Sequence, residues 1–308
     1  MRRRSRWLLL GIIALLLLWT GVPLARAYAL LRTQSGGAAP ARSADLPVQD
    51  ASFRAADGVP LDGLFARGAT RAPSVVLVAG FKSTRDSMLP YARFLHGAGY
   101  NVLLYDGRGL GRSGGRFSAG LREVDDARGT VAYLLERRDL RDHRCALLGV
   151  SLGAGVAIVA AARTPAVQAT VADSAYVDQG ALVARLDTLS LGPLRLPLAP
   201  VAPWAVDRLL GAPLAAFSPL HAAGMVAPRA LLLIHSRRDS NPTTPLAGAL
   251  SLYHTARRPV SLWIAPRASA ACGSYPLYPL AGALAAQPAE YRRRVLAFLR
   301  RYLGPARG

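Results

Sequence analysis

The apolar residues of this chain follow two different patterns. Trp7 to Ala25 forms one unbroken run of nineteen residues without a charged side chain. From Pro47 onward, short apolar runs of strand length alternate with amphipathic stretches of helical length. The first two strand-like runs flank Asp57-Gly58, a pair that favours a β-hairpin. The chain thus predicts an apolar N-terminal segment followed by one large domain.

The alternation in this domain can be assigned element by element. We predict strands over Val48–Arg54, Pro60–Ala66, Ser74–Ala79, Tyr100–Tyr105, Cys145–Val150, Val167–Ala172, Ala230–His235 and Val260–Ala265. We predict helices over Asp86–Gly97, Arg122–Arg137, Ser151–Arg163, Pro245–Ala256 and Pro288–Leu303. Short apolar strands that alternate with helices are typical of a parallel sheet covered on both faces. The expected fold class is therefore α/β, with a mostly parallel, doubly wound sheet.

One stretch, from about Tyr176 to Pro219, breaks this alternation. It is rich in Leu, Pro and Ala, carries few charges, and is too long for an ordinary connection. We expect residues 176–219 to form a small cap over the carboxyl edge of the sheet. The apolar composition of this cap favours a substrate with an apolar acyl or alkyl group.

The N-terminal apolar run has the properties of a membrane anchor. At about 1.5 Å per residue it just spans a hydrocarbon core of roughly 30 Å. Four arginines precede it, which places the N-terminus in the cytoplasm and the rest of the chain outside. The alternative is a cleaved signal peptide and a secreted protein, because Ala25-Arg26-Ala27 offers a cleavage site. Signal peptides usually have shorter apolar regions, so we predict an anchor (1–27), a flexible linker (28–45) and an α/β domain (46–304).

The charge of the chain does not indicate a nucleic-acid partner. The net charge is +20, and Lys82 is the only lysine. The arginines are scattered, with no basic stripe interleaved with aromatic residues and no recognisable nucleic-acid module. The two cysteines lack metal-ligand spacing, and no cofactor motif occurs. We therefore expect no nucleic acid, no metal and no cofactor.

The strongest chemical signal is Gly149-Val150-Ser151-Leu152-Gly153, between a predicted strand and a predicted helix. In such a strand-turn-helix junction the turn is tight and strained, so the flanking residues must lack side chains. The serine hydroxyl is then presented at the edge of the sheet. The alternative is a plain helix start with Ser151 as its N-cap. The strand-turn-helix context favours the nucleophile elbow.

These segments resemble the α/β-hydrolase superfamily, and within it a membrane-anchored bacterial branch related to Bem46-like and serine-aminopeptidase-like hydrolases. The similar segments are VVLVAGFKSTRDSMLPYARFLHGAGYNVLLYDGRGLGRSGG, LLGVSLGAGVA, VADSAY and LLLIHSRRD. The resemblance implies an α/β-hydrolase fold and serine acyl transfer on an ester, thioester or peptide.

The resemblance also assigns site residues. It implies that Ser151 is the nucleophile and that Asp239 is the acid of a catalytic triad. It implies that Phe81 and Leu152 supply the backbone N–H groups of an oxyanion hole, and two such groups aimed at one point stabilise a tetrahedral intermediate. For Asp239, a solvated turn aspartate is the alternative. Two further matching aspartates, Asp106 and Asp173, are interpreted as structural residues that hold turns.

The histidine of the triad is not found where the resemblance implies it. A serine hydroxyl needs a base to take its proton, yet no histidine follows His254. The implied position holds Cys272 or Ala271, and a thiol with an ordinary pKa near 8.5 is no substitute. Among the histidines present, only His235 is predicted at the carboxyl end of a strand. Two hypotheses remain: a serine hydrolase with His235 or an unidentified base, and a catalytically impaired module that binds a ligand or a partner.

Overall fold

The computed structural model describes residues 2–32, 34, 35, 46–177, 180, 183, 185–192, 194–239, 241, 243–270 and 282–305. The chain divides into two compact units. We call Met1–Arg32 with Gln179–Ala216 the N-terminal unit, and Thr33–Asp178 with Phe217–Gly308 the sheet unit.

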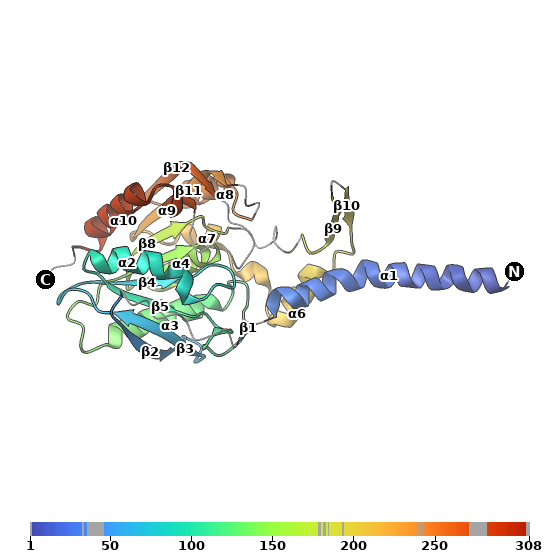
Figure 1. Cartoon of the computed structure of the whole chain (residues 1–308), viewed down its shortest axis with the longest axis horizontal. Coiled ribbons are helices and arrows are strands. Elements are labelled where there is room, and N and C mark those ends of the chain that lie inside the picture. The colour runs from blue at the N-terminus through green and yellow to red at the C-terminus, as the bar shows by residue number, and fades with distance from the viewer. Residues whose placement is uncertain are drawn as a thin grey trace. The chain divides into compact units, whose positions relative to one another are not determined.

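The sheet unit is built on a mostly parallel sheet, which is eight-stranded within the described residues and has the order β12-β11-β8-β7-β4-β5-β3-β2 (Figure 1). Its strands are β2 (Val48–Arg54), β3 (Pro60–Ala66), β4 (Ser74–Val78), β5 (Asn101–Tyr105), β7 (Cys145–Val150), β8 (Val167–Asp173), β11 (Ala230–Asp239) and β12 (Val260–Ala270). The β2–β3 and β3–β5 pairs are antiparallel, and the other pairs are parallel. The predicted fold class is confirmed.

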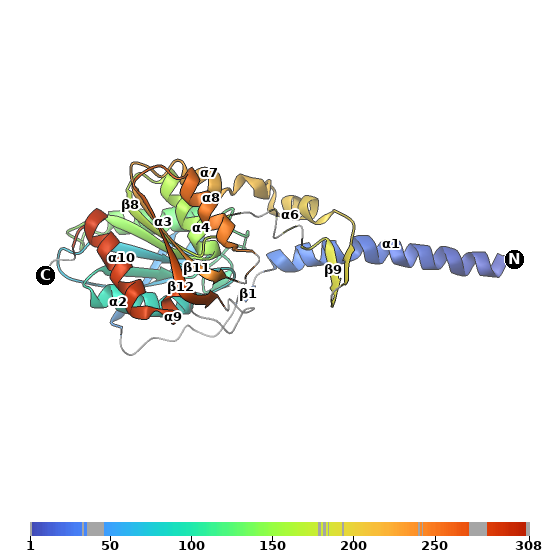
Figure 2. The ribbon, with the colours of Figure 1, turned by 90° about the horizontal axis from the view of Figure 1, so that it is seen from above.

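Helices cover both faces of this sheet (Figure 2). Their bounds are α2 (Leu89–Gly97), α3 (Glu123–Glu136), α4 (Leu152–Arg163), α7 (Pro219–Ala223), α8 (Leu246–Thr255), α9 (Gly282–Ala286) and α10 (Pro288–Tyr302). On the face of α2 and α10, the Tyr291 ring lies 6.0 Å from the Tyr91 ring, 6.2 Å from the Phe94 ring and 6.1 Å from the Trp263 ring, centroid to centroid. These buried aromatic rings pin α10 and α2 to the sheet.

The structure differs from the predicted elements at several points, and β12 extends to Ala270 where Ala265 was predicted. The predicted helix Asp86–Gly97 begins with a 3-10 turn, η1 (Arg85–Met88), and α9 was not predicted. Strand β11 continues from His235 to Asp239, because after a register shift Arg238 and Asp239 still pair with β12. A two-stranded ladder also joins β1 (Gln34–Ser35) to β6 (Leu110–Gly111). The predicted linker, 28–45, therefore contains paired backbone.

The N-terminal unit consists of one long helix and the segment predicted as a cap. Helix α1 (Arg2–Leu31) contains a 26-residue candidate span, Arg6–Leu31, in which an 18-residue window has mean hydropathy 2.4, and it is long enough to cross a membrane. It extends four residues past the predicted anchor end at residue 27. No strand or helix was predicted in the cap segment, but it contains a hairpin of β9 (Thr188–Leu191) and β10 (Leu194–Pro197), followed by α6 (Ala202–Leu210) and η2 (Leu214–Ala216).

Candidate active site

Ser151 lies at the junction of β7 and α4 in a strained backbone conformation. Its φ is 55° and its ψ is −121°, a region that residues with a Cβ rarely occupy. The Ser151 N–H donates to the Asp173 carbonyl at 2.8 Å, and the Ser151 carbonyl accepts from the N–H groups of Ala154 at 3.0 Å and Tyr176 at 3.2 Å. These bonds hold the turn on both sides.

The two glycines around Ser151 are required by close backbone contacts. A Cβ on Gly149 would lie 2.1 Å from the Gly153 carbonyl oxygen. A Cβ on Gly153 would lie 2.3 Å from the carbonyl oxygens of both Val78 and Ala79, at the end of β4. In addition, the Ser151 side chain makes no capping hydrogen bond to α4. The N-cap interpretation therefore fails, and the geometry is that of a nucleophile elbow.

The segment that follows β4 passes beside Ser151. A Cβ built on Gly80 would lie 3.4 Å from the Val150 carbonyl oxygen and 3.5 Å from the Ser151 Cβ. Phe81 comes next in the chain, and Leu152 is the first residue of α4, where backbone N–H groups are free of helical partners. The two residues assigned to an oxyanion hole thus come from neighbouring segments at one edge of the sheet.

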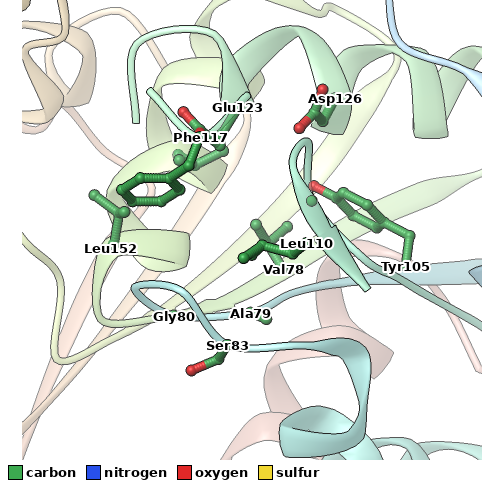
Figure 3. Close-up of a pocket in the computed structure, with 12 residues that line it drawn as sticks. Val78, Ala79, Gly80, Ser83, Tyr105, Leu110, Phe117, Glu123, Asp126 and Leu152 are labelled. Atoms are coloured by element: carbon green, nitrogen blue, oxygen red, sulfur yellow. The ribbon is translucent and has the colours of Figure 1, made fainter. Parts of the chain in front are cut away.

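A small cavity adjoins these segments (Figure 3). Its volume is about 30 Å³, room for about two water molecules. Its walls include Gly80, Leu152 and Phe117, together with the carboxyl-bearing residues Glu123 and Asp126. In the described residues this cavity is far smaller than a pocket for a drug-sized ligand, which measures about 300 Å³ or more.

Asp239 ends β11 with its carboxylate enclosed. The side chain is 0% exposed. Its Oδ1 accepts the Asn241 N–H at 2.8 Å and its Oδ2 accepts the Thr244 hydroxyl at 3.1 Å. Burial raises the pKa of Asp239, while these hydrogen bonds and His235 act in the opposite direction. This environment contradicts a solvated turn and suits a group that orients a neighbour.

His235 is the described histidine nearest to that carboxylate. Its Nε2 lies 3.5 Å from the Asp239 Oδ2, and its side chain is 0% exposed. Burial lowers the pKa of His235, and the charge of Asp239 raises it. Burial therefore favours the neutral imidazole, the form that can accept a proton.

The register of the sheet sets how far His235 is from the elbow. Asp173 on β8 pairs with Val150 on one side and with Ile234 on the other. Ser151 and His235 each follow one residue later, on strands separated by β8. With about 4.8 Å between neighbouring strands, their backbones lie roughly 10 Å apart. His235 is therefore at the correct edge of the sheet, but its imidazole is directed to Asp239.

The remaining predicted aspartates hold the framework of the site. Asp106 is fully buried and accepts the Arg85 N–H at 2.9 Å. Asp173 is also fully buried and accepts the Ser174 hydroxyl at 3.0 Å. Burial raises the pKa of Asp173 to about 7, and the hydrogen bond from Ser174 and the nearby Tyr291 hydroxyl oppose that rise. Asp106 thus accepts a backbone N–H, as expected, whereas the bond described for Asp173 comes from a side chain.

One buried ion network was not anticipated. Arg108, 2% exposed, donates to the Asp126 carboxylate at 2.9 and 2.7 Å and to the Asp57 carboxylate at 2.8 and 2.9 Å. It ties the β2–β3 turn to the first turn of α3, beside the cavity. The only sequence signal was Arg108 itself, the first arginine in YDGRGLGRSGG. Its two partners lie 18 and 51 residues away in the chain.

The expected position of the triad histidine and the expected absence of a metal site remain. Cys272 and Ala271, the expected histidine positions, lie outside the described residues. Within the described residues, no group of three or more His, Cys, Asp or Glu side chains could hold a metal ion.

Known proteins with the same architecture include several hydrolases. The family model described as serine aminopeptidase, S33, matches residues 69–210. An esterase of Pyrococcus furiosus superposes with a TM-score of 0.66 at 24% identity, covering 86% of this chain and 99% of that one. The α/β hydrolase GrgF of Penicillium sp. superposes with a TM-score of 0.64 at 20% identity, covering 83% and 99%. The chain therefore has the α/β-hydrolase fold, and its residues 69–210 match the serine aminopeptidase, S33, model.

The similarity to two curated proteins covers less than half of this chain. The polyketide transferase grgF of Penicillium sp. is 29% identical over 137 residues, 43% of this chain and 47% of that protein. An uncharacterized protein of Mycobacterium tuberculosis is 35% identical over 140 residues, 44% of this chain and 49% of that protein. The chain spans about half the length of these curated relatives. The comparisons therefore support the α/β-hydrolase fold and leave the substrate open.

Proposed function

We propose that the protein is a membrane-anchored serine hydrolase in which Ser151 attacks an ester, thioester or peptide with an apolar acyl group. The observation that carries this proposal is the strained backbone of Ser151, φ 55°, held between two glycines that no other residue can replace without backbone movement. A fold that uses this junction only for packing has no need of such strain.

The proposed reaction proceeds through an acyl-enzyme. The Ser151 Oγ adds to the substrate carbonyl carbon, and the backbone N–H groups of Phe81 and Leu152 bind the resulting oxyanion. Collapse of this intermediate releases the alcohol, thiol or amine with a proton, and water then hydrolyses the Ser151 ester. The esterase among the structural neighbours supports an ester as substrate class. The apolar α1 supports the membrane anchor, with the N-terminus in the cytoplasm.

The reaction also needs a base that accepts the proton of the Ser151 hydroxyl. We propose His235, paired with Asp239, as the acceptor of the Ser151 proton. Loss of the histidine in a serine protease costs roughly a millionfold in kcat and leaves about 10³ to 10⁴ over the reaction in water. A chain without a working base would thus be a very slow hydrolase.

A second candidate function is a ligand- or partner-binding module with an intact elbow and no turnover. It is favoured by the full enclosure of His235, 0% exposed, together with the absence of any histidine after His254. This alternative predicts that Ser151 stays unreactive although it is correctly placed.

A fluorophosphonate activity probe on the full chain in detergent micelles separates the two functions. We expect labelling of the wild type and none of Ser151→Ala. If His235 is the base, His235→Gln slows labelling by at least about 100-fold, whereas the exposed His254→Gln control leaves the rate unchanged. Absence of labelling in the wild type would support the binding module. Equal rates for the wild type and His235→Gln would eliminate His235 as the base.

A further inference from the structure

The β9–β10 hairpin of the N-terminal unit has one apolar and one polar face. Its register pairs Leu191 with Leu194 and Leu189 with Leu196. Directly opposite residues of an antiparallel pair point to the same face, and alternate residues along a strand share it. The four leucines therefore form one face, which we call the leucine face. The opposite face consists of Thr188, Ser190, Arg195 and Pro197.

The described residues leave most of the leucine face uncovered. Leu191 is 56% exposed, Leu194 54% and Leu196 39%. An isolated two-stranded hairpin is at best marginally stable in water. It needs a further strand or another element packed against its apolar face. The occupant of this face must therefore be an apolar phase or an apolar surface outside the described part of the chain.

Helix α1 indicates what that occupant is, because the base of the hairpin is bonded to it. The Trp19 indole N–H donates to the Pro197 carbonyl at 3.3 Å, and the Ala199 N–H donates to the Trp19 carbonyl at 3.1 Å. The Arg26 guanidinium donates to the carbonyl of Thr188 at 2.8 Å. The hairpin is thus attached at the C-terminal part of the apolar helix, between Trp19 and Arg26.

This attachment sets the depth of the hairpin. Trp19 precedes Ala25, the end of the uncharged run, by six residues, which is about 9 Å along a helix. Figures 1 and 2 both show the hairpin projecting sideways from α1 and not along it. If α1 crosses a bilayer, the hairpin lies within about 10 Å of the membrane surface and roughly in its plane. Amphipathic elements that bind lipid surfaces are found at this depth.

We propose that the leucine face of β9–β10 inserts among the acyl chains of the lipid leaflet that holds the C-terminal end of α1. Arg195, on the opposite face, then points to the lipid phosphates. In α6 of the same unit, Trp204 is 64% exposed and Leu209 52%, and tryptophan is enriched at membrane interfaces. This inference rests on the proposed membrane anchor and adds a second contact, through which the cap segment meets lipid directly.

Site-directed spin labelling of the full chain in phosphatidylcholine–phosphatidylglycerol vesicles tests the insertion. In a Cys272→Ser background, labels are attached to Leu194→Cys on the leucine face, to Ser190→Cys on the polar face and to Leu15→Cys in the middle of α1. Collision with oxygen reports lipid, and collision with a nickel chelate reports water. We expect the label at position 194 to have an oxygen-to-nickel collision ratio at least several-fold above the label at position 190.

The labels at positions 194 and 15 together separate a failure of the insertion from a failure of the anchor. A label in water at position 194 together with a label in lipid at position 15 would overturn the insertion and leave the anchor intact. Labels in water at both positions would overturn the anchor and the insertion with it. A label at position 194 shielded from both reagents would show protein cover, such as a second copy of the chain, and would also contradict the insertion.

Discussion

The sharpest structural prediction concerns Gly153→Ala. The new Cβ would lie 2.3 Å from the carbonyl oxygens of Val78 and Ala79, more than 1 Å inside the usual contact distance of about 3.5 Å. Both obstacles are backbone atoms, so no side-chain rotation relieves the clash. The end of β4 must move away from the start of α4. Overpacking of this kind costs about 1–3 kcal/mol of unfolding free energy.

The same movement would separate the two halves of the proposed oxyanion hole. Phe81 follows the displaced segment, and Leu152 belongs to the elbow. A misplacement of about 1 Å in a catalytic group can lower a rate by about 100-fold. We therefore expect Gly153→Ala to lower the fluorophosphonate labelling rate by about that factor, measured well below its unfolding temperature.

Thermal unfolding and labelling of the full chain in detergent measure both effects. Gly97→Ala is the matched control, because a Cβ on this helical glycine meets nothing within 4 Å, and we expect no loss of stability or labelling. Gly80→Ala, whose Cβ would meet only ordinary contacts at 3.4 and 3.5 Å, should also fold normally. Wild-type stability and labelling in Gly153→Ala would refute the close approach of α4 to β4.

Three further predictions concern the charged groups and the missing histidine. Burial raises the pKa of Asp173 from its ordinary value near 3.8 to about 7, so the folded chain holds this proton more tightly than the unfolded chain. The free energy of unfolding should therefore fall between about pH 4 and pH 7, and Asp173→Asn should remove at most about 4 kcal/mol of that fall in urea titrations. Arg108→Met, which leaves the buried Asp126 carboxylate without its cation, should cost about 3–5 kcal/mol in the same assay, while the exposed Arg293→Ala leaves the midpoint unchanged. Cys272→His should raise turnover of p-nitrophenyl esters by orders of magnitude, and no gain would count against Cys272 as the vacated histidine position.

Local sequence patterns were sufficient for most of the sheet unit. Uniform apolar runs gave the buried strands, and the glycines around Ser151 gave the elbow, since both depend on residues close in the chain. The bound of β11 was wrong because the Asp239 pairing depends on β12, which the sequence of β11 does not contain. The buried Arg108 network was missed for the same reason, since its carboxylates come from distant segments.

The β9–β10 hairpin of the cap segment was not predicted, and the reason is different. Leu189, Leu191, Leu194 and Leu196 alternate with polar residues or proline on either side of Gly192-Pro193, which is a hairpin signal. The surrounding prolines and the general excess of Leu and Ala concealed this alternation. A prediction that assigns apolar residues to the protein core also does not anticipate a hairpin whose apolar face is exposed in the described structure.

Acylation of Ser151 can be measured by mass spectrometry of the full chain after incubation with p-nitrophenyl butyrate. We expect one butyryl group per chain, located on the peptide that contains Ser151, and none in Ser151→Ala. With a weak base, deacylation is slow and the adduct should persist long enough to be isolated. A chain that gains no butyryl group, or one that keeps the group in Ser151→Ala, would contradict the account.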